Sequence, residues 1–253
     1  MNENPKNNYA LSSRKRRIAA FIIDHFVFSF LLVGIIFLLL GTNFIDENNF
    51  EKITSVMLPS MFVGFIIYFA KDTFNGISPG KWIMGIMVRD ENHPNEIPSF
   101  GRLLLRNLFL LIWPIEFIVL AASQDKKRLG DKSANAIVVK NPNKPSKLPR
   151  ILALVGIGIV FMSFTILFTG TAMKNSNAYK VAIAEIEKNE DIISETGGIK
   201  GYGMMPTGNV NISNGYGDAQ MEISVLGNEK DIDVVVYLTK QPDGDWILNE
   251  IYK

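Results

Sequence analysis

The chain has 253 residues, of which 47% are hydrophobic and 20% charged, and its formal net charge at pH 7 is +1. It contains no cysteine, which excludes disulfide bonds, thiolate chemistry and cysteine metal sites. The net charge hides a segregation, because basic clusters lie in the N-terminal part whereas from Lys174 onward there are seven Lys and thirteen Asp or Glu. No basic stripe falls on a soluble element, so nucleic acid is not an expected partner.

The first apolar run, Ile18–Leu40, follows a basic cluster and is long enough to cross a hydrocarbon core of ~30 Å. Asp24 interrupts this run, and a carboxylate within a span costs roughly 2.5–3.5 kcal/mol on insertion scales. Arg17 precedes Asp24 by seven residues, which places both side chains on one helix face, about 10 Å apart along the axis. We therefore expect Asp24 to be a functional residue.

Three further apolar segments follow. Val56–Ala70 carries Pro59 near its start, and Ile151–Met173 has no charged residue. Between them, Leu103–Ala122 is interrupted by Arg106, Pro114 and Glu116. The predicted fold class is a membrane α-helical bundle, with three spans plus a re-entrant or fourth helix, followed by a small α+β extracytoplasmic domain. The predicted domains are a membrane domain over 1–140, a basic linker and transmembrane helix over 141–173, and the small domain over 174–253.

The basic residues predict the orientation. The cluster that ends at Arg17 indicates a cytoplasmic N-terminus, and the acidic loop 41–52 suits the external side. Segment 123–150 holds eight Lys and Arg and favours the cytoplasm. A hairpin that folds at Pro114 would keep both ends of 103–122 on the cytoplasmic side. We prefer this hairpin, and a full span remains the alternative. Ile151–Met173 would then carry the C-terminal domain to the external side of the membrane.

Arg17, Asp24 and Asp72 form the predicted charge cluster. If the first two spans are antiparallel neighbours, Arg17 and Asp72 lie at similar depth, with Asp24 about 10 Å further in. The alternative is that Arg17 extends to the lipid headgroups and that Asp72 caps a helix end in water.

These residues resemble the RDD family of bacterial membrane proteins over roughly 12–140. The family is named for one Arg and two Asp, which match Arg17, Asp24 and Asp72, although Arg16 could take the place of Arg17. Gly76–Gly85 and the closing segment with Asp125, Arg128 and Asp131 also resemble its pattern. The resemblance implies little about function beyond a proposed transport of unknown ligands.

Ser78-Pro79-Gly80-Lys81 predicts a tight turn at the membrane surface. The spacing of a phosphate-binding loop is absent. Lys81 is most simply an interfacial anchor beside the amphipathic stretch 82–88, and its alternative role is a contact to an anionic lipid or ligand.

The C-terminal part predicts one helix over Asn175–Thr196, stopped by two glycines, and strands over Gly208–Ser213, Ala219–Leu226, Ile232–Lys240 and Asp245–Tyr252. The alternation from Ile232 to Leu238 indicates one buried sheet face. A transmembrane helix, a short helix and Gly-rich strands ending in Gly244-Asp245-Trp246 resemble the cytochrome oxidase complex assembly protein 1 family over about 150–253. That resemblance implies an accessory role outside the membrane.

The sequence does not predict an enzyme, a cofactor or a metal site, since it has two histidines and no nucleophile arrangement. One hypothesis is a non-enzymatic scaffold in the lipid bilayer whose outer domain binds a respiratory oxidase or another membrane complex. The alternative is a transporter-like or ion-coupled protein in which Asp24 exchanges a proton beside Arg17 and Asp72. So few helices would need a homo-oligomer to form a pathway.

Overall fold

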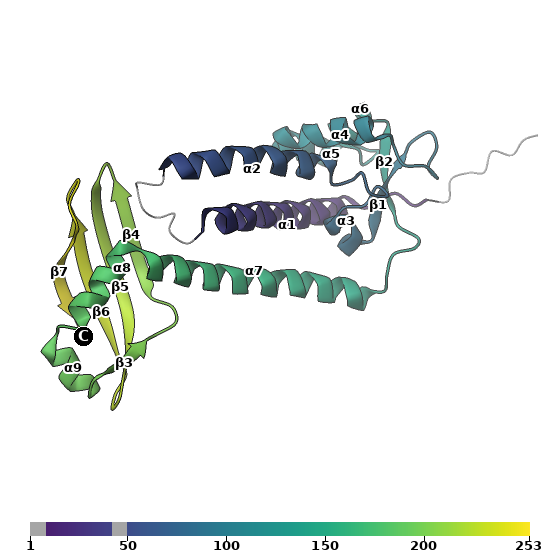
Figure 1. Cartoon of the computed structure of the whole chain (residues 1–253). Coiled ribbons are helices and arrows are strands. Elements are labelled where there is room, and N and C mark those ends of the chain that lie inside the picture. Colours follow the sequence, from purple (N-terminus) through teal and green to yellow (C-terminus); the bar gives the residue numbers. More distant parts are fainter. Residues whose placement is uncertain (1–8, 42–49) are drawn as a thin grey trace, which may run out of the picture. The chain divides into compact units, whose positions relative to one another are not determined.

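The computed structural model describes residues 9–41 and 50–253 (Figure 1). These form two compact units, one with the described residues up to Ile35 and Leu58–Ile159, the other with the described residues of Ile36–Met57 and Val160–Lys253. The acidic loop predicted to be external falls mostly on 42–49, outside the described residues. The predicted domain boundaries at 140 and 173 stay predictions.

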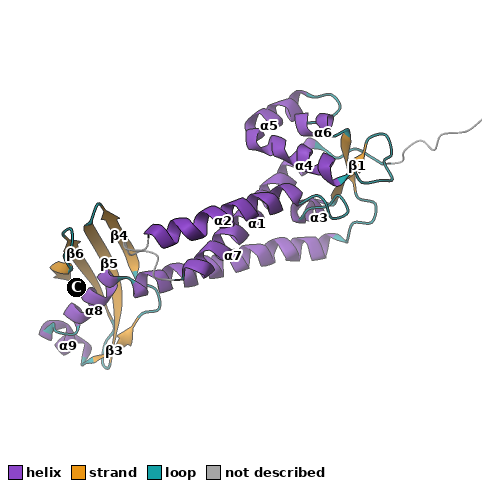
Figure 2. Cartoon of the chain, turned by 45° about the horizontal axis from the view of Figure 1, so that its top comes forward, coloured by secondary structure: helices purple, strands orange, loops and turns teal. Residues whose placement is uncertain are grey.

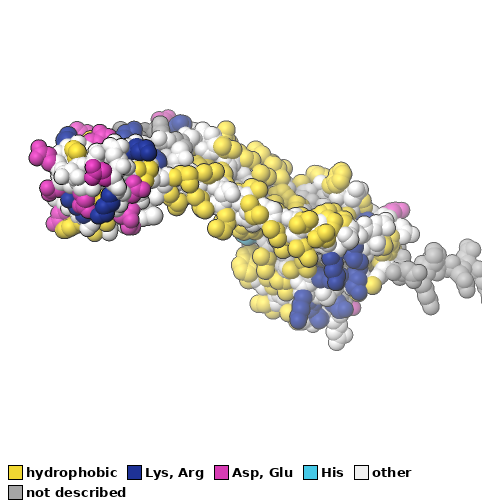
Figure 3. Space-filling view, turned by 90° about the horizontal axis from the view of Figure 1, so that it is seen from below, with side chains coloured by type: hydrophobic (Ala, Val, Ile, Leu, Met, Phe, Trp, Pro, Cys, Tyr) yellow, Lys and Arg dark blue, Asp and Glu magenta, His cyan; other side chains and the backbone are white. Residues whose placement is uncertain are grey.

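Four helical segments of the described chain are long and apolar enough to cross a membrane. They are α1 (Arg14–Leu40), α2 (Phe50–Ala70), the segment Phe100–Ala122 and α7 (Lys147–Asn175). At ~1.5 Å per residue, the 27 residues of α1 extend about 40 Å, more than a hydrocarbon core. Their exposed side chains are largely apolar, whereas acidic ones gather on the C-terminal domain (Figure 3). The four predicted apolar segments are therefore confirmed as helical.

The third of these segments is not one continuous helix. It consists of α4 (Phe100–Leu108), a 3₁₀ turn η2 (Phe109–Ile112) and α5 (Trp113–Ala122). Ile112 leaves the helical region with φ −109° and ψ 41°, and Pro114 in the next turn needs no backbone donor. Both halves pack against α6 (Leu129–Ser133), as Figure 2 shows. The break lies next to Pro114, as expected, while the choice between a hairpin and a full span stays a prediction.

A short helix and a two-stranded sheet complete the first unit. Ser78 caps α3 (Pro79–Met84), which ends at Gly85 in the left-handed conformation, φ 65°. The chain then enters β1 (Ile86–Asp90), which pairs antiparallel with β2 (Ala136–Lys140). The amphipathic surface stretch expected over 82–88 is therefore half helix and half buried strand. The sequence does not predict this sheet, because five-residue strands are too short to establish a period.

The second unit contains a five-stranded sheet in the order β3-β5-β6-β7, with β4 also paired to β5. Helices α8 and α9 pack on one face of it (Figure 2). The elements are α8 (Asn177–Ile186), α9 (Glu190–Thr196), β3 (Ile199–Tyr202), β4 (Thr207–Ser213), β5 (Tyr216–Gly227), β6 (Ile232–Lys240) and β7 (Trp246–Tyr252).

The four predicted strands are confirmed as β4 to β7, and the buried face of β6 holds Val234, Val236 and Leu238. The single helix predicted over 175–196 is wrong. It breaks after Ile186, because the Asn189 side chain accepts hydrogen bonds from two backbone N–H groups and starts α9.

The core of this sheet supports a stability prediction. Ile223 of β5 is 1% exposed, so Ile223→Ala leaves a cavity and should lower the free energy of unfolding by about 2–5 kcal/mol. Ile247→Ala on β7 is the matched control, since that side chain is 60% exposed and its loss should cost less than about 1 kcal/mol. Urea unfolding of the full chain, followed by Trp246 fluorescence after Trp82 and Trp113 are replaced by Phe, measures both. Equal losses would contradict the assigned sheet face.

Candidate functional site: a buried ion-pair network

Among the described residues of the first unit, nine charged side chains are buried together where α1, the turn after α2, α3, α4, α5 and α6 meet. They are linked by ion pairs and hydrogen bonds rather than scattered through the apolar surroundings. We call this set the buried network; it comprises Arg17, Asp24, Lys71, Asp72, Lys81, Arg106, Glu116, Arg128 and Asp131.

Asp24 is held by the start of α3. Its Oδ2 accepts a hydrogen bond from Ser78 Oγ at 2.6 Å and its Oδ1 accepts one from the Gly80 backbone N at 2.7 Å. The ammonium groups of Lys71 and Lys81 each lie 3.8 Å from Oδ2. A Cβ on Gly80 would lie 2.1 Å from the carbonyl oxygen of Ala20, so only glycine lets α3 approach α1 closely enough to make these bonds.

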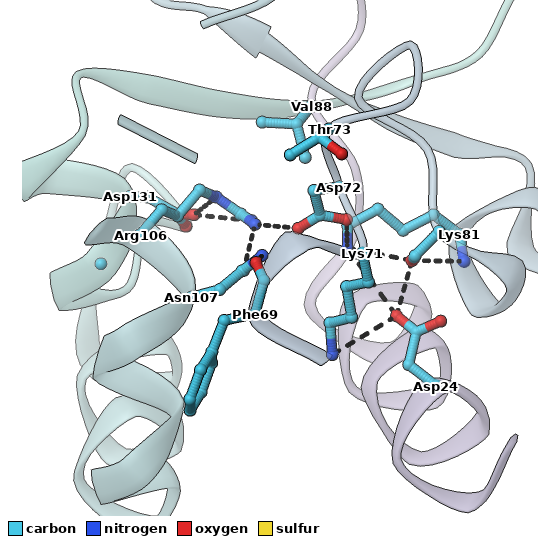
Figure 4. Close-up of polar contacts among 12 residues, drawn as sticks. Asp24, Phe69, Lys71, Asp72, Thr73, Lys81, Val88, Arg106, Asn107 and Asp131 are labelled. Atoms are coloured by element: carbon cyan, nitrogen blue, oxygen red, sulfur yellow. Dashed lines mark hydrogen bonds and ion pairs between the residues drawn. The ribbon is translucent and has the colours of Figure 1, made fainter. Parts of the chain in front are cut away.

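Asp72 lies between two cations, as Figure 4 shows. Lys81 Nζ donates to Oδ1 at 2.6 Å and Arg106 Nη1 donates to Oδ2 at 2.7 Å. Burial alone would raise the pKa of Asp72, but the charges of Lys81 and Arg106 outweigh it and hold the pKa well below its usual range. Asp72 therefore stays ionised as a link between α3 and α4.

Asp131 connects α6 to α1 and α4. It accepts hydrogen bonds from Arg17 Nη2, from Arg106 Nε at 2.9 Å and from the Arg128 backbone N at 3.0 Å. Burial opposes ionisation, yet the neighbouring guanidinium groups hold the pKa of Asp131 well below its usual range. Arg17 Nη1 also donates to the Lys126 carbonyl oxygen, which fixes the loop before α6.

Gly130 lets α6 approach α4 closely, as Gly80 lets α3 approach α1. Its Cβ would lie 2.3 Å from the carbonyl oxygen of Arg106, and its backbone N donates to Glu116 Oε1 at 2.9 Å. Arg128 Nε lies 3.3 Å from Glu116 Oε2. The segments around Gly80 and Gly130 thus each place a glycine against the backbone of a helix, and each brings charged side chains into the buried network.

Lys71 lines a cavity within the network. Its Nζ has no hydrogen-bond partner and lies 3.8 Å from the centroid of the Tyr68 ring. The space for water centres in the cavity is about 30 Å³. Burial, reinforced by the charge of Lys81 and opposed by that of Asp24, lowers the pKa of Lys71 to about 7.

The three residues predicted as a cluster lie in one network, but through partners that the sequence did not suggest. Arg17 pairs with Asp131, whereas Asp24 and Asp72 share Lys81. Lys81 itself is buried and is not the interfacial anchor expected. The alternatives of a headgroup contact for Arg17 and a solvated cap for Asp72 are therefore wrong. In the closing segment, Arg128 and Asp131 join the network and Asp125 is exposed outside it.

Sequence reasoning gave no site role to three members of the network: Lys71, Arg106 and Glu116. It also did not single out the uncharged Asn107, whose side chain accepts hydrogen bonds from Arg106 and Arg128. Arg106 and Glu116 carry the signal that marked Asp24, a charge inside an apolar run, but were interpreted only as weakening the third span. Among the described residues no group of three or more His, Cys, Asp or Glu could hold a metal ion.

Four apolar helical segments of the described chain, together with a buried ionic network, define a multi-pass integral membrane protein. Residues 11–135 match the RDD family, and this range contains the entire network. The match supports the family resemblance for that part of the chain. Among curated proteins and solved structures, none matches this chain. The resemblance of 150–253 to the cytochrome oxidase complex assembly protein 1 family stays a prediction.

The Arg17–Asp131 contact predicts a coupling between two positions 114 residues apart. Arg17→Gln removes one of the cations that balance the buried charge of Asp131, and Asp131→Asn removes the carboxylate that Arg17 faces. Each should lower the free energy of unfolding by about 3–5 kcal/mol. The double variant should cost about 0.5–3 kcal/mol less than the sum. Arg17→Gln combined with Arg102→Gln is the control, and should be additive within about 0.5 kcal/mol because Arg102 pairs with Asp90, outside the buried network. Additivity in the first cycle would contradict the contact.

Lys71 predicts a pH dependence. Its folded pKa of about 7 lies below the unfolded value of about 10.4, so the unfolded state binds more protons between the two. The free energy of unfolding should therefore rise from pH 7 to pH 10 relative to Lys71→Met, with the charges of Asp24, Asp72, Lys81 and Arg128 present in both proteins. Urea unfolding in detergent at each pH measures the difference. Parallel pH profiles of the two proteins would refute a depressed pKa.

Proposed function

We propose that this chain is a non-enzymatic membrane scaffold that holds its C-terminal domain beside a partner membrane complex. The observation that supports this most is that each carboxylate of the buried network accepts a hydrogen bond or an ion pair from at least two donors. These hydrogen bonds and ion pairs connect six segments of the chain into one base.

The C-terminal domain offers the surface for a partner. β7 ends the strand order of the sheet, so its outer edge can accept a further strand. Ile247 and Tyr252 on β7 are exposed, and Tyr252 packs edge-to-face on Tyr237 of β6 with ring centroids 5.9 Å apart. The resemblance of 150–253 to an oxidase assembly family makes a respiratory oxidase the first partner to test.

The scaffold role predicts a partner that depends on the C-terminal domain. Deletion of 175–253 should abolish co-purification of the partner while the helical base stays inserted. Ile247→Lys places a charge on the edge strand and should weaken the association at least tenfold. Ile193→Lys on α9, which is 37% exposed, is the matched control and should leave it unchanged.

One observation favours the alternative of ion-coupled transport. Lys71 is a buried cation without a hydrogen-bond partner beside Asp24, and a proton-exchanging group would be of this kind. Since Asp24 is bound by α3, Lys71 would take the role that the sequence suggested for Asp24. Loss of ion flux in vesicles on Lys71→Met, together with a partner set that deletion of 175–253 leaves unchanged, would replace the scaffold by the transporter.

The proposal also places the N-terminus in the cytoplasm and the C-terminal domain outside a bacterial cytoplasmic membrane. Because the chain lacks native cysteine, single exposed positions can be labelled. A membrane-impermeant thiol reagent should modify Asn228→Cys in intact cells and should modify Lys144→Cys only after lysis. Labelling of Lys144→Cys in intact cells would instead indicate that 100–122 crosses the membrane completely.

A further inference from the structure

The cavity in the buried network is lined by more positive than negative charge. Its polar walls come from five cations and one carboxylate, and the rest of its wall is apolar. The six are Arg17, Lys71, Lys81, Arg106, Arg128 and Asp24.

The network as a whole carries an excess positive charge. Its five cations face four carboxylates, so one positive charge has no counterpart among the described residues of the network when all nine groups are ionised. A buried net charge is expensive, because little water is present to screen it.

Among the five cations of the buried network, Lys71 has the weakest contacts to carboxylates. Arg17, Lys81 and Arg106 each donate hydrogen bonds to a carboxylate of the network, whereas Lys71 makes none. The Lys71 side chain is only 2% exposed, and the nearest carboxylate oxygen lies 3.8 Å from its Nζ. Its N–H groups can therefore donate to an occupant of the cavity that Lys71 lines. Three donors on a buried ammonium group require an acceptor.

The size of the cavity selects among acceptors. About 30 Å³ for water centres is room for roughly two waters, which is enough for a chloride ion, since chloride is little larger than water. A water molecule would accept a hydrogen bond but leave the excess charge, whereas one monovalent anion satisfies the donors and neutralises the network.

We propose that this cavity binds one chloride-sized monovalent anion, held by the ammonium group of Lys71 and faced by the surrounding guanidinium groups. The anion completes the charge balance of the helical base. The site is independent of the proposed scaffold role, since it concerns residues 17–131 and no residue of the sheet.

The test compares the purified full chain in neutral detergent at pH 6.5 in sodium chloride and in sodium gluconate of equal ionic strength. Chloride should raise Tm by roughly 2–4 °C or more, and bromide should do the same. Lys71→Met should lose this dependence and be no less stable than the natural chain in gluconate. Lys71→Arg, which keeps the charge, and Lys15→Met at an exposed position of α1 should retain the chloride effect.

Broadening of the ³⁵Cl magnetic resonance by the natural chain measures binding directly and does not require that a variant folds. It should fall at least severalfold in Lys71→Met and persist in Lys15→Met. Equal Tm values in chloride and gluconate without broadening would overturn the proposal, as would broadening that Lys71→Met leaves intact. Stabilisation by phosphatidylglycerol alone, with none from chloride, would also overturn it, because a lipid headgroup would then be the occupant.

Discussion

A carboxylate buried among apolar helices needs cations close by, and this requirement organises the first unit. Asp24, Asp72, Glu116 and Asp131 each sit where two elements meet, and each takes its partners from a different element. The helices can therefore approach one another only in the arrangement that closes these pairs. The glycines near the starts of α3 and α6 follow from the same requirement, since a side chain at Gly80 or Gly130 would separate the backbones that the charges hold together.

The sequence predicted where charges are buried better than it predicted which charges meet. Asp24 stood out because it interrupts an apolar run, and that signal depends on composition alone. The partners of Arg17 and Asp24 could not be found in this way, because Arg17 meets Asp131 across 114 positions through a fold that no local pattern records. Helical spacing indicates that Arg17 and Asp24 lie on one face of α1. It does not indicate which neighbouring side chain each of them contacts, because tertiary packing decides that.

The same contrast separates the two sheets. Strands β4 to β7 were predictable, because seven or more residues of alternation between turn residues establish a period. The pair β1–β2 was not, since each strand has five residues and their partners lie about fifty positions apart. The break between α8 and α9 was also missed, because helical periodicity does not weigh the cap that Asn189 supplies.

The long separation between Arg17 and Asp131 has a consequence for biosynthesis. A ribosome delivers α1 and α2 to the membrane long before it has made α6 or β2, so Asp24 and Lys71 enter without most of the network. The base can close only when the residues up to Lys140 have left the ribosome, just before α7 begins to emerge. Until then these helices depend on the insertion machinery to shelter their charges, and a nascent chain arrested before residue 128 would be the form most exposed to quality-control proteases.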